Sequence, residues 1–264
     1  MAALRKRDGP PIVVGANQAV HLKPNMGIRT NGVIGGPGNV TLEYFDFVNG
    51  RADSIRFLLF KAGVKHKFVG HSPEKWTELK SNPPQGGEFN GLPRLTIDGV
   101  EYGQSMAVLR ALGTKHGLYF PEDPKTSYYC DVIIDCFVDV LDETTNITLP
   151  VLLEYDGKPD PDDIQGIVDI WKKVHVPLFK MLCTNMRTHG GKYAAGNVLT
   201  IADCIMVSGM ANIWCNQDGP WNSTFNELFA RGNVDKGVID VYFATLREAF
   251  SDRLNNPNRK ALPI

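Results

Sequence analysis

The chain has 264 residues, a formal net charge of −1, 43% hydrophobic residues and 22% charged residues. This composition is ordinary for a globular protein of one or two domains. The near-zero charge gives no reason to expect a nucleic-acid partner, and no apolar run approaches the roughly 20 residues that span a membrane. All five cysteines follow residue 129 and none forms a Cys-x-x-Cys pair, so we do not expect a disulfide framework.

Residues 1–40 are rich in glycine and proline, lack serine and show no helical or strand period. Asp8 is their only acidic residue, against several basic ones that include Arg5, Lys6 and Arg7. We therefore predict an extended arm and not a domain. The cytosol is the default location, with an organelle as the alternative if the arm is a targeting segment, and the arm is a candidate contact for protein partners.

Residues 41–120 alternate strand and helix patterns. We expect strands at Thr41–Phe47 and Lys65–Val69, helices at Asp53–Ala62 and Ser105–His116, and a hairpin of Arg94–Ile97 and Val100–Tyr102 around Asp98-Gly99. A strand–helix–strand unit followed by a hairpin and a helix is the thioredoxin-like order, with a right-handed crossover between the first two strands. The sequence therefore predicts an α/β domain of this class.

Residues 121–264 carry almost no strand signal and begin with a linker at Pro121–Pro124. Apolar residues recur at helical spacing through residues 129–141, Ile164–Met186, Ala202–Trp214 and Val238–Phe250. Thr200-Ile201-Ala202-Asp203 is a capping box before an apolar run. We predict a second domain that is entirely helical.

Five short signatures occur in order along the first domain. They are Tyr44 at a strand end, Gly50-Arg51-Ala52-Asp53 at a helix start, Trp76 with Lys80, Leu92-Pro93 before a strand, and Gln104-Ser105 at a helix start. Together they resemble the glutathione-binding half of cytosolic glutathione S-transferases, closest to the sigma, pi and mu classes. The capping box after Gly196-Asn197 resembles that family's helical domain, so the resemblance covers about residues 41–250. It implies a thioredoxin-like domain at 41–120 followed by an all-helical domain at 121–264.

The resemblance places Tyr44 where the family holds its catalytic tyrosine. Glutathione reacts as the thiolate, and a tyrosine hydroxyl can donate a hydrogen bond to that sulfur without carrying charge. The plainer interpretation is a half-buried aromatic residue at a strand end. The segment Asp46–Asn49 is one residue longer than the family's loop, which puts the position of the Tyr44 hydroxyl in question.

The other positions would bind glutathione. Leu92 and Pro93 match the family's cis-proline turn, which presents a backbone to the cysteinyl unit. Gln104 and Ser105, at a helix N-terminus, would hold the γ-glutamyl carboxylate, although serine there is also an ordinary helix cap.

The glycyl end would meet Trp76 and Lys80, which lie four residues apart on one helix face. Arg51 may be read as a contact across the site or as a solvated side chain. Asp135, in the acidic series Asp131, Asp135 and Asp139, matches a residue that reaches the partner's glutathione in a homodimer, and its plainer interpretation is a solvated helix face.

The leading hypothesis is a transferase that adds the glutathione thiolate to a small electrophile, with glutathione as co-substrate and no metal. The alternative is a catalytically weak or inactive structural subunit of the same fold, docked in a larger assembly through the arm. A thioredoxin-like redox protein is a poor third hypothesis, because no cysteine precedes residue 130.

Overall fold

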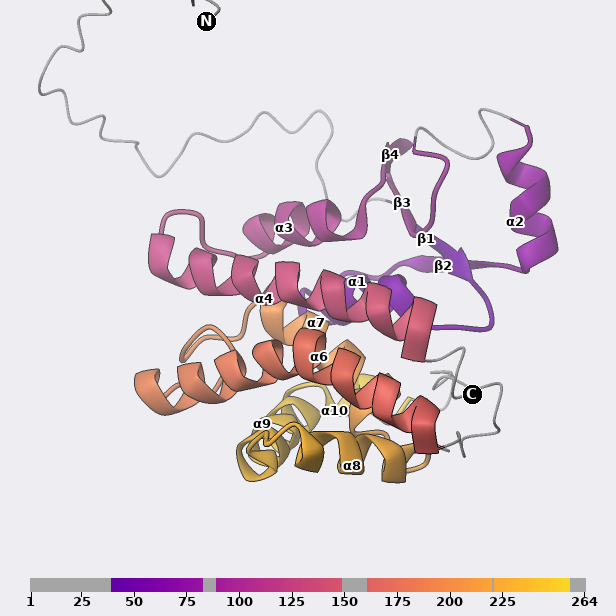
Figure 1. Cartoon of the computed structure of the whole chain (residues 1–264). Helices are drawn as coiled ribbons and strands as arrows, with labels where there is room; N and C mark the ends of the chain where they lie inside the picture. Colours follow the sequence, from indigo (N-terminus) through magenta and orange to yellow (C-terminus); the bar gives the residue numbers. More distant parts are fainter. Residues whose placement is uncertain (1–38, 83–88, 149–160, 220, 257–264) are drawn as a thin grey trace, which may run out of the picture. The chain divides into compact units, whose positions relative to one another are not determined.

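The structure is a computed structural model that describes residues 39–82, 89–148, 161–219 and 221–256. The predicted arm falls outside these ranges except for its last two residues. In the described residues a sheet with its helices comes first and a series of helices follows (Figure 1). The first elements are β1 (Val40–Phe45), α1 (Gly50–Lys61), β2 (Lys67–His71), α2 (Pro73–Lys80), β3 (Arg94–Ile97), β4 (Val100–Tyr102) and α3 (Ser105–Lys115).

The sheet has the order β2-β1-β3-β4, with β1 parallel to β2 and antiparallel to β3, and β3 antiparallel to β4. Helix α1 makes the connection between the two parallel strands. The hairpin turn at Asp98-Gly99 has positive φ at both residues, 50° and 82°, as a two-residue hairpin requires. This is the thioredoxin-like arrangement that the sequence predicts.

Two predicted strand ends differ from the structure because of contacts that local patterns do not reveal. Strand β1 ends at Phe45, where Asp46 turns and donates its backbone N–H to the carbonyl of His71 at 3.2 Å. Strand β2 continues to His71, whose imidazole lies 2.9 Å from the carboxylate of Glu43 on β1. Helix α1 begins at Gly50, as the signature Gly50-Arg51-Ala52-Asp53 predicts, three residues before the apolar pattern that starts at Asp53.

All described elements after α3 are helical. They are α4 (Pro124–Glu143), the π-helix η1 (Thr144–Thr148), α6 (Pro161–His189), α7 (Ile201–Gly209), the π-helix η2 (Met210–Trp214), α8 (Asn222–Arg231), α9 (Lys236–Ala249) and α10 (Ser251–Leu254). The predicted helix Ala202–Trp214 is thus two elements, α7 and η2. Helix α8 was not predicted, although its buried residues Phe225, Leu228 and Phe229 have helical spacing.

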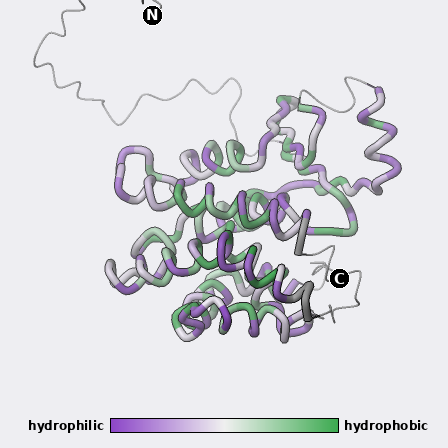
Figure 2. The backbone as a smooth tube through the Cα atoms, in the orientation of Figure 1, coloured by the Kyte–Doolittle hydropathy of each residue, from purple (hydrophilic) through white to green (hydrophobic). Residues whose placement is uncertain are grey.

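Helix α7 links the two halves of the described chain. All nine of its residues are buried, and it packs against α1 and α3 on one side and α4 and α9 on the other. Apolar segments converge there in the tube of Figure 2. The predicted capping box is present, with Asp203 bonded to the backbone of Thr200 at 2.8 Å. The boundary between the two predicted domains, at residue 120, stays a prediction.

Candidate functional site

A cavity of about 310 Å³ opens between the start of α1, the turn before β3 and the start of α3. Seven residues line it: Arg51, Phe89, Gly91, Leu92, Pro93, Gln104 and Ser105. Five of these, all except Phe89 and Gly91, are site residues predicted from the sequence. The structure therefore gathers residues that are up to 54 positions apart in the chain into one hollow.

The turn before β3 and the start of α3 form two walls of this cavity. The peptide bond between Leu92 and Pro93 is cis, as the resemblance implied. Gln104 has a φ of 63°, a conformation that costs energy for a residue with a side chain and that is often found at binding sites. It directly precedes Ser105, the first residue of α3, which is buried. The first N–H groups of a helix have no partner within the helix and favour an anion, so this corner of the cavity suits a carboxylate.

Tyr44 is the second-last residue of β1, and its hydroxyl lies against the first turn of α1. The hydroxyl oxygen accepts the backbone N–H of Arg51 at 3.2 Å, and the side chain is 8% exposed. Burial raises the pKa of Tyr44, an effect that the Arg51 hydrogen bond only partly offsets. The phenol is therefore neutral at pH 7 and keeps its proton for donation.

The side chain of Arg51 turns to the helical half of the chain. Its guanidinium bonds the carboxylate of Asp142 near the end of α4, and both side chains are partly exposed. The backbone N–H of Arg51 thus bonds the Tyr44 hydroxyl, while its side chain forms an ion pair with Asp142 beside the cavity. Sequence reasoning missed Asp142 as a partner, because the two residues are 91 positions apart.

No family model matches the chain, but known proteins match it in sequence. The chain is 31% identical over 169 residues to glutathione S-transferase alpha-1 of Rattus norvegicus, which covers 63% of the chain and 70% of the rat protein. It is 28% identical over 171 residues to glutathione S-transferase 1 of Ascaris suum, covering 65% of the chain and 78% of that protein. The chain belongs to the glutathione S-transferase family.

Solved structures of glutathione S-transferases share the fold. That of Ascaris lumbricoides matches 84% of the chain and 99% of its own length, with a TM-score of 0.63 and 24% identity. A Nu-class enzyme from Haemonchus contortus matches 84% of the chain and 98% of its own length, with a TM-score of 0.64 and 22% identity. The relatives that match in sequence thus include alpha-class and nematode transferases.

The remaining positions predicted from the transferase resemblance lie outside the cavity lining just described. Trp76 on α2 is buried, with its ring centroid 5.9 Å from that of His71, and Lys80 at the end of α2 is exposed. The segment Ser81–Gly91, which follows α2, falls mostly outside the described residues. The roles of Trp76 and Lys80 stay predictions.

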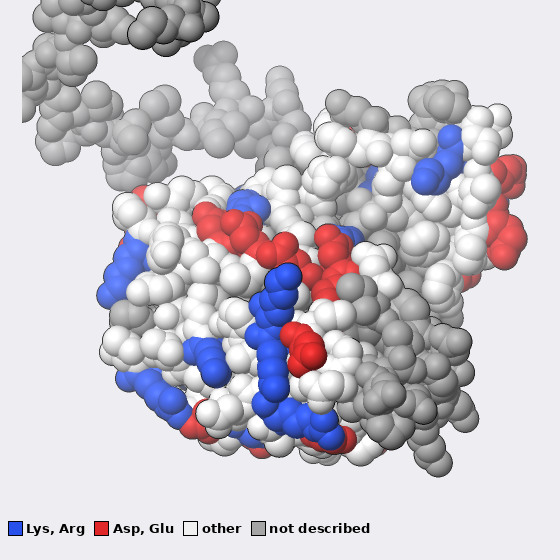
Figure 3. All heavy atoms as spheres, viewed as in Figure 1, with Lys and Arg blue, Asp and Glu red and all other residues white. Residues whose placement is uncertain are grey.

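Asp135 lies on the outer face of α4. Its carboxylate is 3.4 Å from the guanidinium of Arg110 on α3, which also bonds Asp131 at 2.8 Å. Figure 3 shows acidic side chains gathered in a band on this side of the molecule, where the sequence places Asp131, Asp135, Asp139 and Asp142 along α4. The role of Asp135 toward a partner subunit stays a prediction.

Phe89 is a cavity residue that sequence reasoning missed. Its ring lies over Gly103, where an added Cβ would be only 2.3 Å from the ring, and its side chain is 51% exposed. An exposed phenylalanine beside a polar hollow offers apolar contact to a ligand without closing the hollow. The signal in the sequence was weak, because Phe89 follows a run of loop residues with no period.

Proposed function

We propose that the protein is a glutathione transferase that adds the glutathione thiolate to a small electrophile. The observation that carries this proposal is the cavity formed by Leu92, Pro93, Gln104 and Ser105 with Arg51, whose backbone N–H bonds the Tyr44 hydroxyl. Membership of the family supports glutathione as the co-substrate. Within the described residues, no cluster of side chains could hold a metal ion, and the proposed chemistry needs none.

The chemistry follows from the donors available. Ser105 and the N-terminus of α3 would hold the γ-glutamyl carboxylate, and the Leu92 backbone would align the cysteinyl unit. The glutathione thiol would lose its proton to solvent, and the Tyr44 hydroxyl would keep its own proton and donate a hydrogen bond to the thiolate sulfur. The hydrogen bond from Arg51 to the Tyr44 oxygen polarises the O–H bond and makes the phenol a stronger donor. The thiolate then attacks the electrophilic carbon, and the carbon–sulfur bond forms as the bond to a leaving group breaks and that group departs with its electron pair, or as a π bond opens and the resulting carbanion takes a proton from solvent.

The test is a glutathione titration of the full-length protein, with thiolate followed by its ultraviolet absorption near neutral pH. We expect a saturable signal in the wild type, and its loss in Tyr44→Phe with glutathione binding nearly unchanged. Removal of one such donor typically costs about 10²–10³ in rate. Tyr128→Phe, on an exposed tyrosine of α4, is the matched control and should behave as wild type. Equal turnover in the wild type and Tyr44→Phe would refute the role of Tyr44.

A second candidate is a glutathione-binding subunit that does not conjugate, docked to other proteins through residues 1–40. The burial of Tyr44 and its place outside the cavity lining favour this candidate. The same titration separates the two proposals. Glutathione binding without a thiolate signal would support the subunit, and the electrophile turnover of the wild type would then equal the background rate.

We also propose that the active unit is a homodimer in which Asp135 reaches the partner's glutathione. The exposure of Asp135 on α4 supports this, as do the acidic neighbours that surround it. The cytosol is the proposed location. In the described part of the chain no helix has the length and apolar character needed to span a membrane. Light scattering on the full-length protein measures the oligomeric state, and a monomer at micromolar concentration would refute the dimer.

A further inference from the structure

A chain of buried polar side chains joins the β1–α1 loop to the helical half of the protein. Asn49, the last loop residue, donates its side-chain amide to the Oδ1 of Asn212 on η2 at 3.1 Å. The Asn212 amide in turn donates to the Oδ2 of Asp53 on α1 at 2.8 Å. The guanidinium of Arg253 on α10 bonds the other carboxylate oxygen of Asp53. Asn49, Asp53 and Asn212 are all buried.

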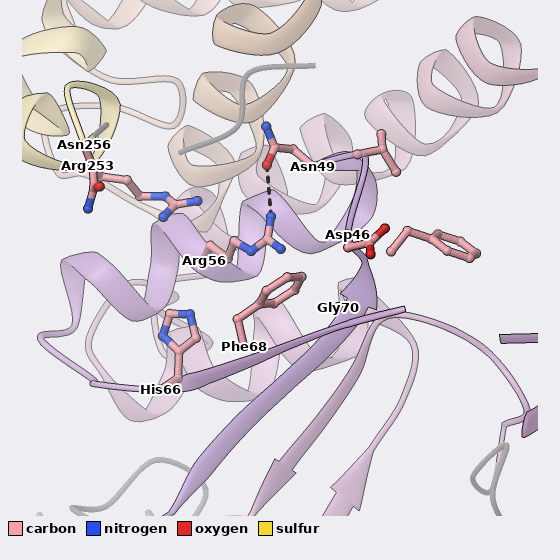
Figure 4. A pocket seen from close by; sticks show the side chains of 10 residues that line it. Asp46, Asn49, Arg56, His66, Phe68, Gly70, Arg253 and Asn256 are labelled. Atoms are coloured by element: carbon pink, nitrogen blue, oxygen red, sulfur yellow. Dashed lines mark hydrogen bonds between the residues drawn. The ribbon is translucent and has the colours of Figure 1, made fainter. Parts of the chain in front are cut away.

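Asn49, at one end of this series of hydrogen bonds, lines a second pocket of about 600 Å³. There the Nη1 of Arg56 donates to the Oδ1 of Asn49 at 3.0 Å, the bond drawn as a dashed line in Figure 4. The Arg56 guanidinium carbon lies 4.2 Å from the centroid of the Phe68 ring, so the guanidinium is held by both contacts. The Asn49 side chain is therefore fixed from two sides, by α1 and by η2.

Asn212 is placed for this role by the π-helix. The element η2 continues α7 directly, and the Asn212 amide also donates to the carbonyl of Ser208, four residues earlier, at 2.8 Å. Its amide thus makes two hydrogen bonds and its carbonyl oxygen accepts one, in a site that is 6% exposed. Single π-helical turns inside helices are frequently found at functional sites.

The position of Asn49 bears directly on Tyr44. Asn49 is followed by Gly50 and then by Arg51, whose backbone N–H bonds the Tyr44 hydroxyl. The loop Asp46–Asn49 is the segment that is one residue longer than the family resemblance leads us to expect. A longer loop can adopt more conformations. When its last residue, Asn49, is held in place, fewer of these conformations remain, and the start of α1 with the Arg51 N–H is better fixed.

We propose that Asn212 is a positioning residue for thiolate activation, which acts through Asn49 to hold the Arg51 N–H and the Tyr44 hydroxyl in place. This inference rests on the proposed transferase function. Asn212 touches neither glutathione nor the reacting atoms. Its effect on the reaction therefore depends on the presence of the Tyr44 hydroxyl.

The kinetic test compares Asn212→Ala in the wild type and in Tyr44→Phe. In the wild-type background we expect kcat to fall about tenfold, since misplacement by 1 Å can cost on the order of 10²-fold, with the Kd for glutathione changed less than twofold. In the Tyr44→Phe background the same substitution should cause no further loss. The matched control is Asn185→Ala, which removes a buried asparagine of α6 outside this chain of contacts and should leave kcat unchanged. Equal losses in both backgrounds would overturn the proposal.

A measurement without glutathione separates this inference from the proposed function. Hydrogen–deuterium exchange of the unliganded protein, followed on peptides that cover residues 45–53, reports the Arg51 amide. Asn212→Ala should speed that exchange at least tenfold, and Asn185→Ala should not. If Asn212→Ala does not fold, Asn49→Ala breaks the same hydrogen bond from the other side and serves in its place. Unchanged exchange would overturn the positioning role even if the enzyme proves active, whereas faster exchange in a protein that makes no thiolate would refute only the transferase function.

Discussion

The backbone N–H of Arg51 donates a hydrogen bond to the hydroxyl oxygen of Tyr44 at 3.2 Å, and the residue just before Arg51 is Gly50. A Cβ added to Gly50 would lie 2.4 Å from the Tyr44 hydroxyl oxygen, and Gly50 has a φ of 41°. Glycine is needed here both for the conformation and for the close approach of the tyrosine. The sequence signature Gly50-Arg51 therefore has a physical reason in this chain, which is to bring a peptide N–H to the phenol.

The first prediction concerns Gly50→Ala. The new methyl group would displace the Tyr44 hydroxyl, and we expect the thiolate signal and kcat to fall at least as far as in Tyr44→Phe, about 10²–10³. The matched control is Gly63→Ala. Gly63 also has a positive φ, 67°, but an added Cβ would meet nothing within 4 Å. Both variants should lose about 1 kcal/mol of stability from backbone strain. Comparable activity in the two variants would show that the contact with Tyr44 does not matter.

Phe89 gives the second prediction. If its exposed ring forms a wall of the glutathione cavity, Phe89→Ala should weaken glutathione binding about three- to tenfold, because apolar contact area is lost. Phe47→Ala is the matched control, since Phe47 is 47% exposed and lies outside the described lining of that cavity. Isothermal titration calorimetry of both variants with glutathione measures the effect. A Phe89→Ala protein that binds as tightly as wild type would remove Phe89 from the site.

Local signals in the sequence were sufficient for much of the fold. The hairpin at Asp98-Gly99 and the end of α1, predicted at Ala62 and found at Lys61, depend on residues that are close in the chain. Helix α1 ends where the Gly63 and Val64 N–H groups bond the carbonyls of Phe60 and Leu59. These hydrogen bonds join residues only a few positions apart, so the residue types in the segment are enough to predict them.

Contacts between distant segments could not be predicted in this way. Asn49 and Asn212 are 163 positions apart, and each is an ordinary polar residue in its own segment. The pairing of Arg51 with Asp142 depends on where α1 and α4 lie relative to each other in the folded chain, which no local pattern encodes. The family resemblance placed Ser105 and Leu92 at one site, but not the polar chain that holds the Tyr44 loop. The longer loop was visible in the sequence, whereas the side chain that fixes it was not.

The third prediction concerns the capping box at Asp203. This buried carboxyl accepts hydrogen bonds from the backbone N–H groups of Ala194 and Thr200, at 2.9 and 2.8 Å, and from the Tyr242 hydroxyl at 2.8 Å. Asp203→Ala leaves these donors buried without their acceptor, and we expect the free energy of unfolding to fall by about 3–5 kcal/mol. Asp235→Ala, at the exposed cap of α9, should cost only about 1 kcal/mol. Urea denaturation compares the two, and equal losses would contradict a special role for the buried cap.

The last prediction is a pH dependence that originates in His175. Burial lowers the pKa of this histidine to about 3. Its Nε2 atom lies 3.0 Å from the Thr144 hydroxyl and 3.3 Å from the Glu143 carboxylate. Below about pH 6.5 the unfolded chain binds a proton that the folded protein excludes, so stability should fall as the pH decreases, by roughly 1 kcal/mol per pH unit. His175→Gln removes this titration and should flatten the curve between about pH 6 and pH 4, whereas His116→Gln, at a partly exposed histidine, should not. Urea unfolding at several pH values measures the slope, and parallel slopes for wild type and His175→Gln would exclude His175 as its source.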